Sequence, residues 1–145
     1  MSTAPNHVTT VQTMYAAFGR ADMPGLLAHV SEDVDWRINV DPQAPGAAAV
    51  SDFRPFRGKK GVSEFFAIIG RDVEFHSFQP LSFLTGGNEV AVRVLFDGTI
   101  RPTGRRVKVE AIHHFTFNER GHVTRFLESF DTLAVAAAWN AVKAV

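Results

Sequence analysis

The 145-residue sequence contains no cysteine, which excludes disulfide bonds, thiolate metal ligands and cysteine nucleophiles. No apolar run approaches the ~20 residues that a membrane-spanning helix needs. The first ten residues have neither the basic start nor the apolar centre of a signal peptide. We therefore expect a cytoplasmic protein that has no membrane partner.

The sequence also lacks an excess of either charge. Fifteen Lys and Arg residues balance fifteen Asp and Glu residues, so the formal net charge is zero. A protein of this kind does not produce the basic field that nucleic-acid binding requires. The short basic run at residues 104–108 is expected to be a solvated strand face, and no nucleic-acid partner is predicted.

Among the aromatic residues, tyrosine and tryptophan are scarce and phenylalanine is abundant. The sequence has one Tyr, two Trp and 13 Phe. Its length predicts one domain over residues 1–145, large enough to bury a core without metal or disulfide support. So much phenylalanine in a small domain indicates either an aromatic core or an apolar cavity.

Four segments are predicted to be helical. In the first three, apolar residues recur every three or four positions, as they do on one face of a helix. Asp22, followed by Pro24, is placed to cap the second helix, and Asp131 the last, which is rich in alanine. The predicted helices cover residues 8–18, 23–30, 61–69 and 132–145.

Five segments are predicted to be strands because apolar and polar residues alternate in them. A tight turn at residues 118–121 joins the last two. A loop rich in proline, glycine and alanine, residues 41–58, is predicted to be either a lid or a surface loop. The predicted strands cover residues 34–38, 73–83, 89–96, 107–117 and 122–130.

Helices come mainly first in the chain and strands mainly afterwards, which favours the α+β class. We expect a curved antiparallel sheet that is roofed on one face by the N-terminal helices. Such a sheet encloses a cone-shaped cavity, which the phenylalanine content suits.

The best candidate for chemistry lies in the hairpin at residues 107–131. His113 shares a strand face with Phe115 and other apolar residues, and Glu128 shares a face with Phe126 and Phe130. If both faces point inward, the hairpin brings His113 and Glu128 opposite or diagonal to each other. Such a pair can remove and return a proton near neutral pH. The alternatives are a buried pair that only satisfies its own hydrogen bonds, and strands that face the other way.

Several segments resemble the SnoaL-like polyketide cyclase branch of the NTF2-like superfamily, which has a cystatin-like fold. They are the run YAAFGRADMPGLLAHVSEDVDW, the turn PFRGKKGV, the turn RPTGRRV and the hairpin AIHHFTFNERGHV that ends in ESFD. The superfamily includes ketosteroid isomerase, limonene-epoxide hydrolase and scytalone dehydratase. Because this fold also hosts binding and assembly domains, the resemblance leaves the activity open.

The resemblance argues against two activities of the superfamily. The base of ketosteroid isomerase falls on Ile38, which cannot move a proton, unless a strand shift brings Asn39 or Asp41 into its place. The oxyanion tyrosine of that enzyme falls on Met14, one position from Tyr15, and its oxyanion acid falls on His113. Epoxide hydrolases need an Asp-Arg-Asp set, and Arg93 has no aspartate of matching parity nearby.

The cyclases provide a better match, because they place a histidine and an acid on the last two long strands. These positions correspond to His113 and, allowing one residue of slack, Glu128, where the family has aspartate. The resemblance implies a small apolar ligand and no cofactor, and no residue spacing suggests a metal site. The predicted cavity-lining residues are Met14, Tyr15, Phe18, Trp36, Ile38, Phe66, Phe115, Phe126 and Phe130.

Two functional hypotheses follow. The first is a cofactor-free isomerase, cyclase or dehydratase that acts on an apolar carbonyl compound through Glu128 and His113. The second is a non-catalytic module that binds a small ligand or forms a homodimer. In that dimer the outer sheet face would pair with a second subunit through Arg93, Arg106, Lys108, Glu110 and Arg125.

Overall fold

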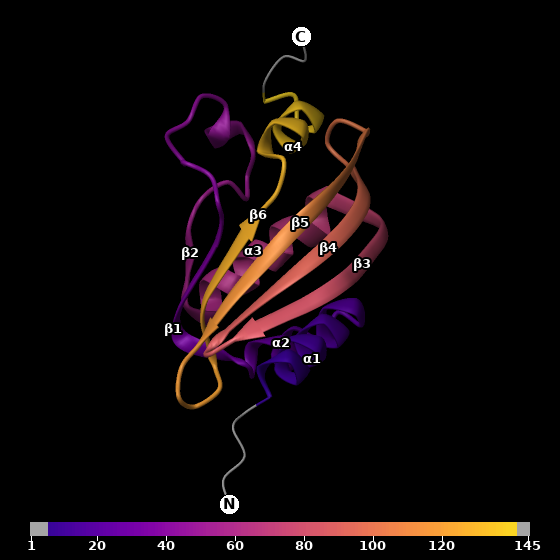
Figure 1. Cartoon of the computed structure of the whole chain (residues 1–145). Coiled ribbons are helices and arrows are strands. Elements are labelled where there is room, and N and C mark those ends of the chain that lie inside the picture. The colour runs from indigo at the N-terminus through magenta and orange to yellow at the C-terminus, as the bar shows by residue number, and fades with distance from the viewer. Residues whose placement is uncertain (1–5, 142–145) are drawn as a thin grey trace, which may run out of the picture.

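The computed structural model describes residues 6–141 and consists of helices packed against one six-stranded sheet (Figure 1). The helices are α1 (His7–Gly19), α2 (Met23–Leu27), α3 (Gly58–Asp72) and α4 (Thr132–Ala138), with a short 3₁₀ helix η1 (Ala47–Ala49). The strands are β1 (Val30–Ile38), β2 (Phe56–Arg57), β3 (Val73–Gly86), β4 (Glu89–Ile100), β5 (Arg105–Phe117) and β6 (Val123–Ser129).

Side-chain caps fix where the helices begin. Asn6, Asp22 and Asp131 accept hydrogen bonds from backbone N–H groups in the first turns of α1, α2 and α4, which satisfies donors that a helix start leaves free. The predicted caps Asp22 and Asp131 are therefore confirmed. Helix α4 ends at Ala138, earlier than predicted, because the backbone takes a positive φ of 59° at Asn140. Residues 142–145 of the predicted helix lie outside the described residues.

The strand order in the sheet is β2-β1-β6-β5-β4-β3. All neighbouring strands are antiparallel except β1 and β6, which are parallel. The prediction of an α+β fold with a curved sheet is confirmed, and the expectation of a wholly antiparallel sheet is corrected at this pair. Strands β1 and β6 are far apart in the sequence, so no tight turn forces them to be antiparallel.

Two further strand predictions need correction. Strand β1 begins at Val30, within the segment predicted as the end of the second helix. Strand β2 lies inside the predicted loop 41–58, where its two residues pair with Asp35 and Trp36 of β1. A strand of two residues is too short to show the alternation that identifies longer strands.

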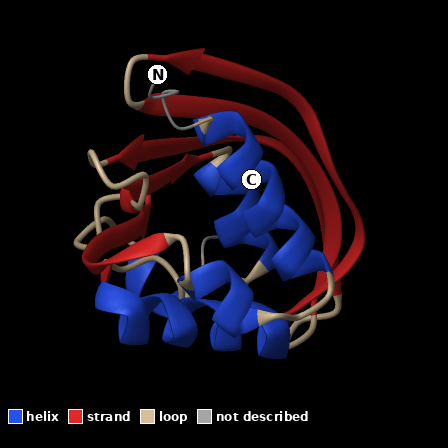
Figure 2. Ribbon diagram, turned by 90° about the horizontal axis from the view of Figure 1, so that it is seen from below, coloured by secondary structure: helices blue, strands red, loops and turns tan. Residues whose placement is uncertain are grey.

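The long strands β3, β4 and β5 curve around the helices (Figure 2). Register shifts between Phe75 and Ser77 and between Pro80 and Ser82 interrupt the pairing of β3 with β4, and such bulges bend a strand. Alternate residues of β4, including Val90, Val92 and Val94, point to the concave side and are completely buried. The concave face of the sheet and the helices together form the core.

None of the helices within residues 6–141 is both long enough and apolar enough to cross a membrane.

Candidate active site

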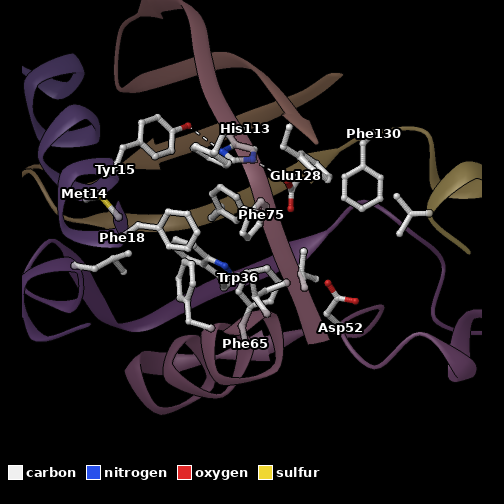
Figure 3. Close-up of a pocket in the computed structure, with 18 of the residues that line it drawn as sticks. Met14, Tyr15, Phe18, Trp36, Asp52, Phe65, Phe75, His113, Glu128 and Phe130 are labelled. Carbon is white, nitrogen blue, oxygen red and sulfur yellow. Dashed lines mark hydrogen bonds and ion pairs between the residues drawn. The ribbon is translucent and has the colours of Figure 1, made fainter. Parts of the chain in front are cut away.

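A cavity of about 100 Å³ lies between the concave face of the sheet and the helices (Figure 3). Its lining comes from α1, α2, α3, α4, β1, β3, β4, β5 and β6 and from the loop after η1. Nearly all of the lining side chains are apolar. The predicted residues that line it are Met14, Tyr15, Phe18, Trp36, Phe66, Phe115, Phe126, Phe130, His113 and Glu128.

The position of Ile38 differs from the prediction. Ile38 is buried in the core at 2% exposure but is not among the residues that line the cavity. It lies at the last position of β1, where it pairs with Glu128 of β6. Alternation along β1 places Ile38 on the same face as Trp36, but the cavity does not extend along the strand as far as Ile38.

His113 and Glu128 are directly opposite each other on β5 and β6. The distance from His113 Nε2 to Glu128 Oε2 is 2.7 Å, and the two residues are 6% and 8% exposed. The pairing of β5 with β6 shifts register between Thr116 and Phe117, which leaves His113 directly opposite Glu128. The geometry therefore agrees with the predicted inward faces.

Tyr15 of α1 extends this pair into a chain of three polar groups. Its hydroxyl lies 2.9 Å from His113 Nδ1. Burial, followed by the negative charge of Glu128, raises the pKa of the Tyr15 hydroxyl above its ordinary value. If Glu128 accepts a hydrogen bond from His113 Nε2–H, neutral His113 can accept one at Nδ1 from Tyr15. Both ring nitrogens are then satisfied, and the imidazole is held from two sides.

The second oxygen of Glu128, Oε1, has no hydrogen-bond donor among the described residues. Glu128 lines the cavity, whereas its Oε2 is bonded to His113. A carboxylate oxygen without a donor retains its lone pairs for another partner. Glu128 can thus accept a proton at Oε1 while His113 fixes its position.

Asp52 is a polar cavity residue that the sequence patterns did not identify. It follows η1 in the loop before β2, lines the cavity and is 7% exposed. Burial is the largest cause that raises the pKa of Asp52, to about 7, and the charge of Glu128 adds to it. A hydrogen bond from its own backbone N–H opposes this rise. The one sequence feature that could have identified Asp52 is its position between the apolar residues Val50 and Phe53, in the loop that was predicted to be either a lid or a surface loop.

Trp36 is a second cavity-lining residue with an unpaired polar atom. Its indole Nε1 is buried and lacks a hydrogen-bond partner among the described residues, as does Asp52 Oδ1. Its ring stacks on Phe126 at a centroid distance of 4.1 Å, which fixes its orientation. The cavity residues that the sequence patterns missed are Leu26, Asp52, Phe65, Ile69, Val73, Phe75, Phe78, Phe96, Ile100, Val107, Val135 and Trp139.

The other polar candidates lie outside the cavity lining. Asn39 bonds through its backbone N–H to the carbonyl of Glu128, and Asp41 is exposed and accepts the backbone N–H of Gln43. Neither residue takes the place of the missing base at Ile38. Arg93 is exposed and forms an ion pair with Glu110, so it does not form the Asp-Arg-Asp set of epoxide hydrolases.

Comparisons with known proteins agree with this architecture. Residues 11–126 match the model of the SnoaL-like domain. An NTF2-like protein from Burkholderia xenovorans LB400 is 30% identical, with a TM-score of 0.79 and coverage of 92% of this chain and 95% of its own. A search among curated proteins found no match.

Two more distant structures share the fold. TerC, co-crystallised with polyporic acid, is 22% identical, with a TM-score of 0.75 and coverage of 92% of this chain and 98% of its own. A candidate polyketide cyclase from Xanthomonas campestris pv. campestris is 17% identical, with a TM-score of 0.68 and coverage of 92% and 96%. The match to the SnoaL-like model covers most of the sequence, and the chain therefore belongs to the SnoaL-like family of NTF2-like proteins.

Proposed function

We propose that this protein binds a small apolar carbonyl compound in its cavity and moves a proton of that compound without a cofactor. The observation that carries the proposal is the position of Glu128. One of its oxygens is bonded to His113, and the other has no donor among the described residues, in a cavity with apolar walls. Proton removal next to a carbonyl group is a step shared by isomerisation, aldol cyclisation and dehydration.

The three polar groups have different roles in this proposal. Glu128 accepts the proton from the carbon beside the carbonyl group. His113 is a positioning residue, because both of its nitrogens are engaged by Glu128 and Tyr15. Tyr15 holds the imidazole from the other side and stays protonated, since its pKa is raised. The apolar walls exclude water and strengthen these interactions.

The size of the cavity limits the ligand. A volume of about 100 Å³ is smaller than the about 150 Å³ of a cavity that holds benzene, so the ligand part inside the cavity is at most about one six-membered ring. Among relatives of the same fold, TerC was co-crystallised with an organic compound, polyporic acid. Cyclohexanone, a single ring with exchangeable hydrogens beside its carbonyl group, is therefore a suitable first probe.

Exchange of these hydrogens in deuterated water, followed by NMR, tests the proposal. The protein should accelerate the exchange, and Glu128→Gln should slow it by at least about 100-fold, the usual contribution of a general base. The melting temperature should be nearly unchanged, because glutamine can still accept the hydrogen bond from His113 Nε2–H.

Glu110→Gln is the matched control. Glu110 lies on β5, on the outer face, where it pairs with Arg93, so its replacement should leave the exchange rate unaltered. Equal exchange rates for the wild type and Glu128→Gln would contradict Glu128 as the base. His113 and Glu128 would then be a structural pair that only satisfies its own hydrogen bonds.

A second candidate function is a homodimeric module that has no catalytic role. It is favoured by large apolar side chains on the outer face of the sheet, including Leu84 at 61% and Ile112 at 39% exposure. Arg93, which pairs with Ile112 across β4 and β5, forms an ion pair with Glu110, and an ion pair between Arg106 and Asp97 lies farther along the same face. An apolar centre with a polar rim is typical of protein interfaces. The two functions are compatible, because the outer face and the cavity lie on opposite sides of the sheet.

A further inference from the structure

We propose that Asp52 is a second acid–base group of this cavity, which holds the oxygen of a carbonyl ligand while Glu128 faces the adjacent carbon. This inference rests on the proposed function, since it assumes a carbonyl ligand in the cavity. It assigns a specificity-determining role to a loop residue that no sequence motif singles out.

The first support is the way in which the loop is held on both sides of Asp52. On one side, the Ser51 hydroxyl donates a hydrogen bond of 3.2 Å to Asp72 at the end of α3. On the other side, Phe53 is buried and its ring packs against Phe130 at a centroid distance of 6.2 Å. The carboxyl group of Asp52 therefore has a fixed position in the cavity wall, although it belongs to a loop.

The second support is an unmet need for hydrogen bonds. Asp52 Oδ1 is buried and has no partner among the described residues. Leaving a buried polar atom unpaired is energetically unfavourable, and a ligand group can supply the missing partner. Trp36, which lines the same cavity, also has an unpaired buried atom, Nε1. A protonated Asp52 carboxyl can donate a hydrogen bond to a lone pair of a carbonyl oxygen.

The third support is the contrast between the two carboxyl groups. Burial and the negative charge of Glu128 raise the pKa of Asp52 to about 7, which keeps a large fraction of Asp52 protonated at neutral pH. A protonated carboxyl group donates, whereas the free oxygen of Glu128 accepts. Figure 3 shows Glu128 beside His113, with Asp52 on the loop farther from His113. The cavity thus presents a donor and an acceptor to the same ligand.

The proton step balances in this arrangement. Glu128 takes a proton from the carbon beside the carbonyl group, and the electrons of that C–H bond form the C=C bond of an enol. The C=O π electrons take the proton of Asp52 and become the enol O–H. Asp52 is left as a carboxylate and Glu128 as an acid, and the reverse transfers restore both groups.

Other titratable groups surround Asp52 and bear on any pH effect. The charges of Glu128 on β6 and of Asp72 on α3 both raise the pKa of Asp52. His113 of β5 is hydrogen-bonded to Glu128, and Tyr15 of α1 is hydrogen-bonded to His113. Arg71 bonds to Asp72 and holds the pKa of Asp72 below its usual range. A test must therefore separate Asp52 from these neighbours by substitution.

The test compares cyclohexanone with methylenecyclohexane, which has the same shape but no oxygen. Binding is followed by tryptophan fluorescence at about pH 5.5 and about pH 8.5, on either side of the pKa of Asp52. Wild-type protein should bind the ketone more tightly than the alkene at the lower pH. The ratio of the two affinities should fall about ten-fold at the higher pH, which corresponds to the loss of one hydrogen bond. Asp52→Asn should keep the preference at both, because its amide donates regardless of pH.

Asp41→Asn is the matched control, because Asp41 lies in the same loop but is exposed. It should lose the ketone preference with rising pH as the wild type does. The proposal is overturned if Asp52→Asn retains the wild-type pH profile, or if the wild type shows no preference for the ketone at the lower pH.

Failure of this inference can be distinguished from failure of the proposed function. If Glu128→Gln stops hydrogen exchange while Asp52→Asn retains the wild-type pH profile, only the role of Asp52 is lost. If Asp52→Asn removes the pH dependence but exchange does not depend on Glu128, the ketone binds at Asp52 and Glu128 is not the base.

Discussion

At the scale of single residues, the cavity holds two carboxyl groups in different surroundings. Glu128 shares a hydrogen bond of 2.7 Å with His113, whereas Asp52 Oδ1 has no partner among the described residues. Burial without a hydrogen-bond partner disfavours the charged form of a carboxyl group. Asp52 therefore links the stability of the protein to pH.

The sign of this linkage follows from the direction of the shift. The pKa of Asp52 is raised from 3.8 to about 7 on folding. The favourable contribution of Asp52 to folding stability is thus fully present below its pKa in the unfolded chain, and it is lost as the pH rises through about 7. Relative to Asp52→Asn, the wild type should lose up to about 4 kcal/mol of unfolding free energy between these limits.

Urea unfolding of both proteins over this pH range measures the effect. Asp52→Asn should have a larger free energy of unfolding than the wild type at about pH 8, and this advantage should be absent at about pH 4. Asp41→Asn controls for the loss of a charge from the same loop. A constant difference between the wild type and Asp52→Asn across the range would contradict the linkage.

At the scale of elements, the bend of the long strands makes room for the cavity. Gly98 of β4 pairs with Phe75 of β3 and Val107 of β5, and both partners line the cavity. A Cβ atom at position 98 would lie 2.9 Å from the carbonyl oxygen of Glu74. Close approach of two backbones at a bend is a typical reason for glycine within a strand.

Gly98→Ala should therefore destabilise the fold. The new methyl group would push the backbone of β3 away, and overpacking of this kind costs about 1–3 kcal/mol. The urea midpoint of unfolding gives the measurement. Gly86→Ala, at the end of β3 with no atom within 4 Å of the added Cβ, is the control and should be neutral. Equal midpoints for the two variants would contradict this prediction and would mean that the backbone of β3 can move to accommodate the methyl group at position 98.

At the scale of the whole molecule, the sheet separates two surfaces. The concave face bears the cavity, and the convex face bears Leu84 and Ile112 in exposed positions. The same alternation that turns His113 inward turns Ile112 and His114 outward. The convex face is therefore available to a second subunit without blocking the candidate site.

Ile112→Lys tests this dimer. The substitution would place a charge within an apolar contact, which is costly when the charge has no partner, so a wild-type dimer should become a monomer. Light scattering at micromolar concentration measures the change. Leu133→Lys is the control, because Leu133 is 68% exposed on α4. A wild-type monomer, or a dimer that survives Ile112→Lys, would contradict the interface.

The sequence alone determined the α+β class and most of the strands, and it favoured an inward orientation of His113 and Glu128. These features depend on local periodicity, capping residues and turn residues, which a sequence shows directly. The resemblance of the hairpin and the first helix to SnoaL-like proteins led to the family that the comparisons then established.

Only the tertiary structure decided which residues of distant segments meet. The contacts of Tyr15 with His113 and of Ser51 with Asp72, the parallel pairing of β1 with β6, and the entry of Asp52 into the cavity wall join segments far apart in the chain. Such contacts depend on how the sheet curves and how the loop packs against α3, and no local pattern encodes either. For that reason the sequence indicated one carboxyl group of the site, and the fold supplied the second.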